Sequence, residues 1–379
     1  MSIKTLSKKM LAIVVAGAMT MGLAMPTSVF AAGGDTATNT TEAYISKTFN
    51  TEVGKDEKFS FKAEQVGGNT ENVTIPNISF TKSETGTTTK RAKVSFPEWT
   101  DAGKYEYTVT ETGAAPAITD TKHQTMIMSK AEYTMDVYVS NGDNGLEISN
   151  IIVNKKKDDK GTTVTGKVDI SNTDKNGFNF TNTYVQEAGT GTDPTNPDPT
   201  YNQFGSLNVS KKIVNANGTA ETSTDTFAFT ATFAFPTGTD ANTLGGIKDA
   251  NGEHVTLAED GTYTFRLKAN ENMKFTGVPV GTTITVKESA TKNYKGSAKI
   301  TINGTQLTPV SATKYNAELT AVNNEKLGQK QNTVDVTNTY NDVPVTSIIM
   351  NTLPYVLMIA LCGAALMAFV AFKRRRLQK

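Results

Sequence analysis

The sequence predicts an all-β protein with two tandem β-sandwich domains, at residues 35–186 and 204–342. Apolar residues there alternate with Thr, Asn and Gly, and Asn-Gly pairs interrupt the alternation, as in strands joined by hairpins. A Pro-, Gly- and Asp-rich segment at 187–203 divides this region and is typical of a semi-stiff linker. The two halves also share four similar segments in the same order, which indicates a duplicated domain.

The two ends of the chain predict secretion and anchoring. Residues 1–31 have a basic start, an apolar stretch and small residues before a cut after Ala31, the pattern of a secretory signal peptide. Residues 348–372 are apolar and long enough to cross a bilayer as a transmembrane helix. The basic tail at 373–379 places that end in the cytosol and the bulk of the chain outside.

Composition excludes several classes of function. The 38 Lys and Arg nearly balance the 37 Asp and Glu, but both ends carry only bases, so the part between them is acidic. An acidic region without a basic tract argues against binding to nucleic acid. The single cysteine, Cys362, lies in the C-terminal apolar run, and His123 and His254 stand in unrelated contexts. We therefore expect no disulfide, no metal centre, no cofactor and no Ser-His-Asp chemistry.

A pentapeptide precedes the apolar C-terminal span. Residues 343–347 read Val-Pro-Val-Thr-Ser and resemble the cell-wall sorting signal of Gram-positive bacteria, usually Leu-Pro-x-Thr-Gly. The resemblance implies that a sortase cuts after Thr346, beyond Pro344, and passes the threonine carbonyl to an amine. Val343 and Ser347 depart from the usual motif, which leaves the class of sortase open. The alternative is an ordinary single-pass anchor that happens to follow a Val-Pro turn.

The repeated segments carry polar residues on their apolar faces. The matches pair 46–49 with 210–213, 59–61 with 227–229, 107–111 with 284–288, and 180–184 with 336–340. Alternate residues of a strand share a face, so each unit directs one Lys, one Glu and one Asn into its own core. These residues are Lys47, Glu111 and Asn182 in the first unit, and Lys211, Glu288 and Asn338 in the second. Their neighbours Lys212, Glu106 and Asn179 fall on the opposite, solvent-facing side.

Each of these residues alone has an ordinary explanation at a strand edge or turn, but two matching trios indicate chemistry. Burial favours a neutral, nucleophilic lysine and a protonated glutamate. The amine can then attack the Asn side-chain carbonyl while the Glu shuttles protons, and ammonia leaves. The predicted product is a Lys–Asn isopeptide bond in each domain, formed once per molecule, with Glu111 and Glu288 as the catalytic residues. This is self-processing and not enzyme turnover.

The ectodomain resembles streptococcal-type major pilins built from isopeptide-linked, Ig-like sandwich domains of the collagen-adhesin B type. The motifs that carry the resemblance lie at 44–49, 59–61, 96–97, 103–111 and 178–184. The resemblance implies the bonds Lys47–Asn182 and Lys211–Asn338, and a second kind of bond that joins the cleaved Thr346 of one subunit to a lysine of the next. The acceptor it favours is Lys175, with Lys167 and the run that begins at Lys155 as alternatives.

The leading hypothesis is therefore the shaft subunit of a covalent surface pilus on a Gram-positive cell wall. Its expected partners are a sortase, identical subunits and the peptidoglycan. The alternative is a wall-anchored monomeric adhesin or a minor pilin at the tip or base, which could bind host or surface ligands. Two sandwiches without a further recognition domain favour the shaft. A surface enzyme is disfavoured because the sequence lacks a His-, Cys- or metal-based constellation.

Overall fold

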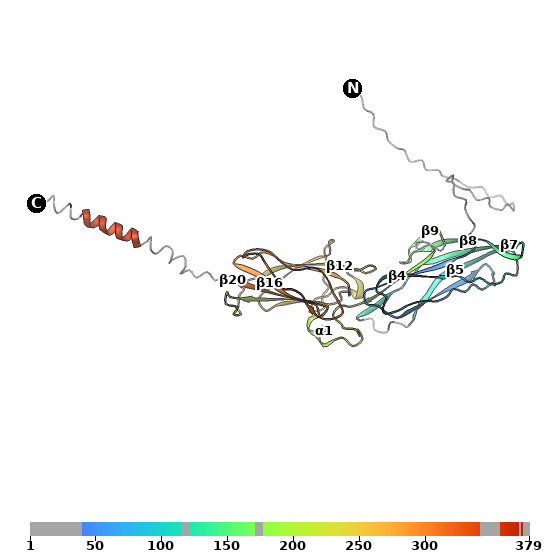
Figure 1. Ribbon diagram of the computed structural model, residues 1–379, viewed down its shortest axis with the longest axis horizontal. Helices are drawn as coiled ribbons and strands as arrows, with labels where there is room; N and C mark the ends of the chain where they lie inside the picture. The colour runs from blue at the N-terminus through green and yellow to red at the C-terminus, as the bar shows by residue number, and fades with distance from the viewer. Residues whose placement is uncertain are drawn as a thin grey trace, which may run out of the picture. The chain divides into compact units, whose positions relative to one another are not determined.

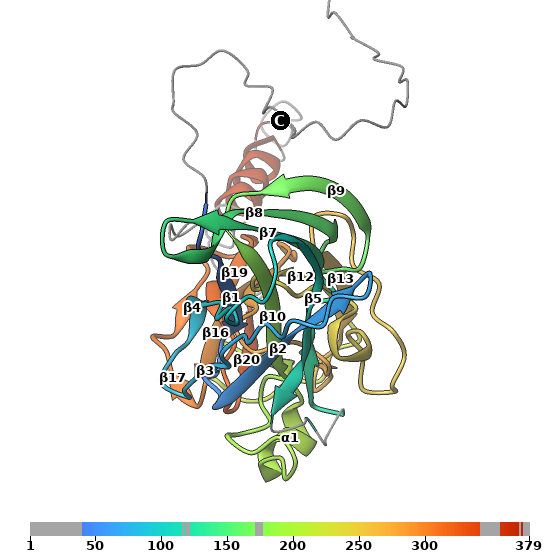
Figure 2. The same cartoon turned by 90° about the vertical axis from the view of Figure 1, so that its right-hand side faces the viewer.

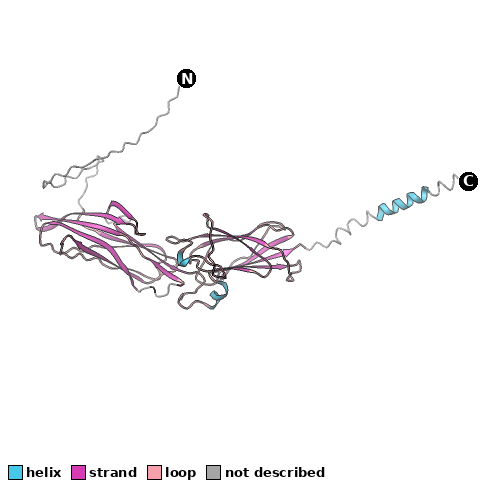
Figure 3. Ribbon diagram, turned by 180° about the vertical axis from the view of Figure 1, so that it is seen from behind, coloured by secondary structure: helices cyan, strands magenta, loops and turns pink. Residues whose placement is uncertain are grey.

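The computed structural model describes residues 40–115, 118, 122–170, 177–341, 357–370 and 373. Within these residues the fold is mostly β, with four sheets that form two sandwich domains (Figures 1 and 3). The expectation of two β-sandwiches is confirmed. The signal peptide with Ala31, the pentapeptide 343–347 and Lys175 lie outside the described residues.

The first domain packs a four-stranded sheet against a six-stranded one. The four-stranded sheet has the order β4-β1-β10-β6 and comprises β1 (Tyr44–Thr51), β4 (Gly86–Lys93), β6 (Gln124–Ile127) and β10 (Phe178–Gln186). The six-stranded sheet has the order β3-β2-β5-β7-β8-β9 and comprises β2 (Glu57–Val66), β3 (Ile78–Phe80), β5 (Gly103–Ala115), β7 (Glu132–Gly142), β8 (Gly145–Lys157) and β9 (Thr163–Val168). Figure 2 shows β7, β8 and β9 side by side, as their antiparallel pairing requires.

The second domain repeats this arrangement. One sheet has the order β14-β11-β20-β16-β17, with β18 also paired to β16; it comprises β11 (Leu207–Val214), β14 (Asn272–Phe275), β16 (Tyr294–Ile302), β17 (Thr305–Gln306), β18 (Val310–Ser311) and β20 (Thr333–Tyr340). The other has the order β13-β12-β15-β19 and comprises β12 (Phe227–Ala234), β13 (Thr262–Leu267), β15 (Thr283–Glu288) and β19 (Leu319–Lys326).

The repeated segments of the sequence occupy equivalent strands. In each domain the first strand pairs in parallel with the last, β1 with β10 and β11 with β20. In each domain the Phe-rich second strand pairs antiparallel with the strand that carries the glutamate, β2 with β5 and β12 with β15. The parallel pair closes a domain by joining its two ends, so residues far apart in sequence become neighbours there.

Aromatic side chains from both sheets fill each core. In the first domain Phe49, Phe59 and Phe80 lie with ring centroids 5.3 to 5.8 Å apart in tilted and edge-to-face contacts, arrangements that aromatic quadrupoles favour. In the second domain Phe265 and Phe275 pack in the same way, with centroids 5.9 Å apart.

Helical structure is limited among the described residues. The segment expected as a linker includes the short helix α1 (Pro199–Phe204), and the 3-10 turn η1 (Thr243–Gly245) lies in the second domain, so the fold is mostly β and not strictly all-β. Of the apolar segment expected to span a membrane, residues 357–370 are described, and they are helical. Within the described residues, none of the helices combines the length and the apolar character needed to cross a bilayer.

Candidate functional site: two buried trios of lysine, glutamate and asparagine

Parallel pairing of the first and last strands brings each Lys close to its Asn. In the first domain Lys47 is opposite Phe180, and Phe49 is opposite Asn182. Two residues along a strand is one full pleat, so Lys47 and Asn182 project from the same face of the sheet as diagonal neighbours. The second domain has the same register, because Lys211 is opposite Val336 and Ile213 is opposite Asn338.

The glutamates reach these pairs from the facing sheet. Glu111 lies opposite Phe61 on β2, and Glu288 lies opposite Phe229 on β12. Next to Glu111 the register between β5 and β2 shifts by one residue, which leaves Thr112 as an inserted bulge residue. Bulges of this kind bend a strand and redirect its side chains. The bulge therefore sets the direction of β5 at the point where Glu111 enters the core.

The first trio forms a connected network. Lys47 Nζ donates to Glu111 Oε2 at 2.8 Å, and Asn182 Nδ2 donates to Glu111 Oε1 at 2.6 Å. The Lys47 and Glu111 side chains are 0% and 1% exposed, and Asn182 is fully buried. The carboxylate thus bridges the amine and the amide from opposite oxygens in a site without contact to solvent.

The second trio has the same members with a different hydrogen-bond pattern. Lys211 Nζ and Asn338 Nδ2 both donate to Glu288 Oε1, at 2.6 and 2.8 Å. The Lys211 and Glu288 side chains are 0% and 3% exposed. Asn338 Oδ1 is buried and has no hydrogen-bond partner among the described residues. This carbonyl oxygen therefore lacks a donor, whereas its counterpart Asn182 Oδ1 accepts from the Ser129 N–H.

Burial moves the protonation equilibria of both pairs in the direction that the chemistry needs. Removal from water lowers the pKa of Lys47 and of Lys211 to about 8, against the opposing effect of the glutamates. The same desolvation raises the pKa of Glu111 and of Glu288, opposed by the lysines. The pKa of the lysine and the pKa of the glutamate thus move toward each other in each pair, which favours a neutral amine beside a neutral acid. Phenyl rings reinforce this environment: the lysine Nζ atoms lie 4.3 Å from the Phe59 ring centroid and 4.1 Å from that of Phe227.

Two neighbours of the trios carry no signal in the sequence. The backbone N–H of Ser129 donates to Asn182 Oδ1 at 2.7 Å, so it polarises the amide carbonyl of the first trio. In the second domain Gly296 lies beside Asn338 and Glu288, and an added Cβ there would sit 3.1 Å from an oxygen of each. Ser129 and Gly296 enter only through tertiary packing, and neither residue type nor strand periodicity could have selected them.

The other predicted residues lie apart from the trios. Lys212 and Asn179 are more exposed than their core-facing neighbours, as the alternation predicts, and Glu106 is half-buried. The alternative acceptor Lys167 lies on strand β9 opposite Asn154, and Lys155 Nζ lies 5.6 Å from the ring of Tyr133. In the part of the chain that the structure describes, no group of three or more His, Cys, Asp or Glu side chains is placed to hold a metal ion.

The family comparison agrees with this geometry. Residues 43–185 match the family model of the Spy0128-like isopeptide containing domain, and residues 205–340 match the model of a domain of unknown function. The first sandwich is therefore similar to the isopeptide-containing domains, in agreement with the resemblance inferred from its motifs. No curated protein matches the chain significantly.

Solved structures that resemble the chain include pilus proteins. The major pilin from Streptococcus pyogenes is 19% identical, with 79% of this chain and 98% of that chain covered and a TM-score of 0.30. The T3.2 major pilin protein of Streptococcus pyogenes is 20% identical, with 80% and 100% covered and a TM-score of 0.31. A pilus-presented adhesin is 13% identical, with 55% and 35% covered and a TM-score of 0.22.

Proposed function

We propose that this chain is the structural shaft subunit of a covalently assembled surface pilus, with each sandwich self-crosslinked by a Lys–Asn isopeptide bond. The observation that supports it best is the pair of equivalent buried trios. Removing an ion from water costs several kcal/mol even when it is paired, and here two Lys–Glu pairs lie inside otherwise apolar cores. Conversion of the lysine to an amide removes one charge from each core and leaves the glutamate as a neutral hydrogen-bond partner.

The proposed reaction in the first domain starts with a proton transfer. Lys47 gives a proton to Glu111 Oε2, which lies 2.8 Å away, and becomes a neutral amine. The amine attacks the side-chain carbon of Asn182, and the new C–N bond pushes negative charge onto Oδ1. The Ser129 N–H, 2.7 Å from Oδ1, stabilises that charge as the donor of an oxyanion hole does.

The leaving group then takes its proton from the same glutamate. Asn182 Nδ2 already lies 2.6 Å from Glu111 Oε1, so the acid is placed to protonate the departing amine. The C–N bond of the amide breaks, ammonia leaves, and the attacking nitrogen returns one proton to the carboxylate. Amine and amide thus give a secondary amide and ammonia, without an oxidant or a cofactor, and held proximity supplies much of the acceleration. Lys211, Glu288 and Asn338 take the same roles in the second domain.

Intact mass spectrometry of recombinant residues 35–342 tests the crosslinks. The chain should weigh two ammonia molecules less than its sequence, and Glu111→Ala or Glu288→Ala should each restore one. Glu106→Ala, on the other face of the same strand, is the matched control and should keep both losses. A wild-type mass equal to the sequence value would refute the mechanism.

We further propose that secretion and anchoring follow the signals at the two ends of the chain. Residues 1–31 direct export, with cleavage after Ala31, and 348–372 hold the precursor in the membrane. A sortase then cuts after Thr346 and transfers it to Lys175 of the next subunit, and the finished fibre is attached to the peptidoglycan. Lys175 stands in an Asp-Lys-Asn-Gly sequence that is typical of an accessible turn.

Immunoblots of wall extracts from the native host distinguish the two candidate functions. A shaft subunit should give a ladder of detergent-resistant multimers, and Lys175→Ala should abolish the ladder while monomer stays on the wall. Lys167→Ala and Lys155→Ala serve as controls and should leave the ladder intact. A ladder that persists without Lys175 would move the acceptor to one of these lysines. A single band in the wild type would instead identify a monomeric adhesin.

A further inference from the structure

The segment between the two domains forms a loop whose two ends lie in contact. Glu187 follows β10 directly, and Ser206 precedes β11 directly, yet Ser206 Oγ donates to Glu187 Oε1 at 2.7 Å. The chain therefore leaves the first domain, makes an excursion through residues 188–205, and returns to its starting point before it enters the second domain. These 18 residues add almost nothing to the distance between the domains.

Glu187 closes the loop through donors from both domains. His123 Nδ1 of the first domain lies 2.6 Å from Oε2, and the Tyr201 hydroxyl of α1 donates to Oε1 at 2.6 Å. The Gly277 N–H of the second domain also donates to Oε1. Glu187 is 2% exposed and His123 is 6% exposed. The Ser206 hydroxyl meets the carboxylate and not the imidazole, so the arrangement is not a nucleophilic triad and points to a structural role.

Backbone hydrogen bonds seat both ends of the loop on the second domain. Ala188 N–H donates to Val278, and Ser206 N–H donates to Phe275, each at 2.8 Å. Ala188 is fully buried and belongs to the core of the second domain. In contrast, the middle of the loop is largely exposed, at Thr192, Asp193, Thr195 and Asn196. The loop is thus held at its base, while most of its tip is exposed to solvent.

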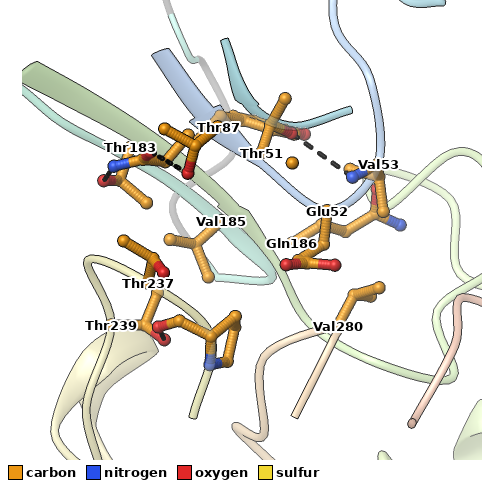
Figure 4. A pocket seen from close by; sticks show the side chains of 14 residues that line it. Thr51, Glu52, Val53, Thr87, Thr183, Val185, Gln186, Thr237, Thr239 and Val280 are labelled. Atoms are coloured by element: carbon orange, nitrogen blue, oxygen red, sulfur yellow. Dashed lines mark hydrogen bonds between the residues drawn. The ribbon is translucent and has the colours of Figure 1, made fainter. Parts of the chain in front are cut away.

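One cleft at this junction is too small for a ligand. Figure 4 shows the cleft where Thr51, Thr183 and Gln186 of the first domain face Thr237 and Val280 of the second. Its volume is about 30 Å³, which holds about one water molecule. This cleft is therefore not a ligand site.

The proposed crosslinks leave this junction as the unprotected part of the load path. A bond from Lys47 to Asn182 and a bond from Lys211 to Asn338 carry tension past the rest of each sandwich. Residues 183–210 lie between the two bonds and are bypassed by neither. Within this stretch the end of β10 pairs with β1 at two positions and with β6 at four, and hydrogen bonds from Glu187, Ala188, Gly189 and Gly191 hold the loop base.

From these observations we propose that residues 188–205 store extra chain length. Under tension the base of the loop opens and these residues extend before either sandwich is stretched. We call this loop the length reservoir. The proposal rests on the proposed function, because it assumes that the chain is under tension in a fibre and that the internal bonds keep the sandwiches from unfolding. Eighteen extended residues span about 60 Å, so each subunit would lengthen by about that amount when the base opens. Closure of the base after the load falls would restore the original length and dissipate energy.

Single-molecule pulling on residues 35–342, held at the two termini, tests the reservoir. We expect a reversible extension step of about 60 Å. A ten-residue Gly/Ser tract inserted between Thr195 and Asn196 should lengthen the step by about 35 Å. The same tract between Asp143 and Asn144 is the matched control and should leave the step unchanged, because that hairpin lies inside the Lys47–Asn182 bypass.

Substitutions at Glu187 test the mechanism of closure. Glu187→Gln keeps the shape of the side chain but loses the charge that strengthens its hydrogen bonds, so it should lower the opening force without a change in step length. Glu187→Ala should lower the force further. If no step precedes rupture, or if the loop insertion leaves its length unchanged, the reservoir is refuted. A step of roughly 400 Å or more would mean that a whole domain unfolded, which would refute the crosslinks instead.

Discussion

Replacement of Glu111 by Gln tests the contribution of the first crosslink to stability. Glutamine has nearly the same size and can still contact Lys47 and Asn182, but it cannot accept and return a proton at the oxygens that lie 2.8 and 2.6 Å from them. We therefore expect Glu111→Gln to fold without the first bond. Its mass should rise by one ammonia relative to the wild type, while the second bond still forms.

The size of the stability loss follows from the length of chain that the bond closes. Lys47 and Asn182 are 135 residues apart. On the loop-entropy estimate used for disulfides, a crosslink over this span stabilises the fold by about 5 kcal/mol. The first domain has 143 residues in its family match, so its entropy of unfolding is roughly 300 cal/mol/K. The ratio predicts that the midpoint of the first domain falls by roughly 15 to 20 °C.

Differential scanning calorimetry together with intact mass provides the assay. The transition of the first domain should move down in Glu111→Gln, and that of the second should move down in Glu288→Gln. Glu106→Gln, on the solvent-facing side of the same strand, should change stability by at most about 0.5 kcal/mol. The reasoning fails if Glu111→Gln still loses both ammonia molecules, or if it loses the bond but keeps the wild-type midpoint.

Two further predictions concern Gly296 and Glu57. Gly296→Ala places a Cβ 3.1 Å from Asn338 Oδ1 and Glu288 Oε2, so the second trio should separate and intact mass should show one ammonia loss. Gly103→Ala, with open space around its Cβ, is the control. Two ammonia losses in Gly296→Ala would contradict the prediction. Burial raises the pKa of Glu57 from 4.5 to about 7, and neither of its side-chain oxygens has a hydrogen-bond partner among the described residues. The folded state then binds the proton more tightly than the unfolded state, so stability should fall by about 3 kcal/mol as the pH rises from 4.5 through 7. Glu57→Gln should therefore raise the unfolding midpoint at pH 8 and leave it nearly unchanged at pH 4.5; equal shifts at both pH values would show that the charge of Glu57 is not responsible.

Strand periodicity was sufficient to identify the trios because the rule behind it is local. Alternate side chains of a strand share a face, so Lys47 between Ile45 and Phe49 had to point into the core once that segment formed a strand. The same rule selected Lys211, and the repetition in two units made chance an inadequate explanation. The two-sandwich fold followed from the same alternation. The segment at 187–203 was predicted only as a boundary, and its composition carries no sign that the chain folds back on itself there.

Long-range geometry decided the features that residue type and spacing leave open. The bulge at Thr112 depends on how β5 aligns with β2, and the Ser129 N–H meets Asn182 only because β6, which ends at Ile127, pairs with β10. Glu187 reads in the sequence as one more polar linker residue. Its contacts with His123 and Ser206 come from segments 64 residues before it and 19 residues after it. Local alternation thus determines which way a side chain points, whereas the packing of separate strands and loops determines what it meets.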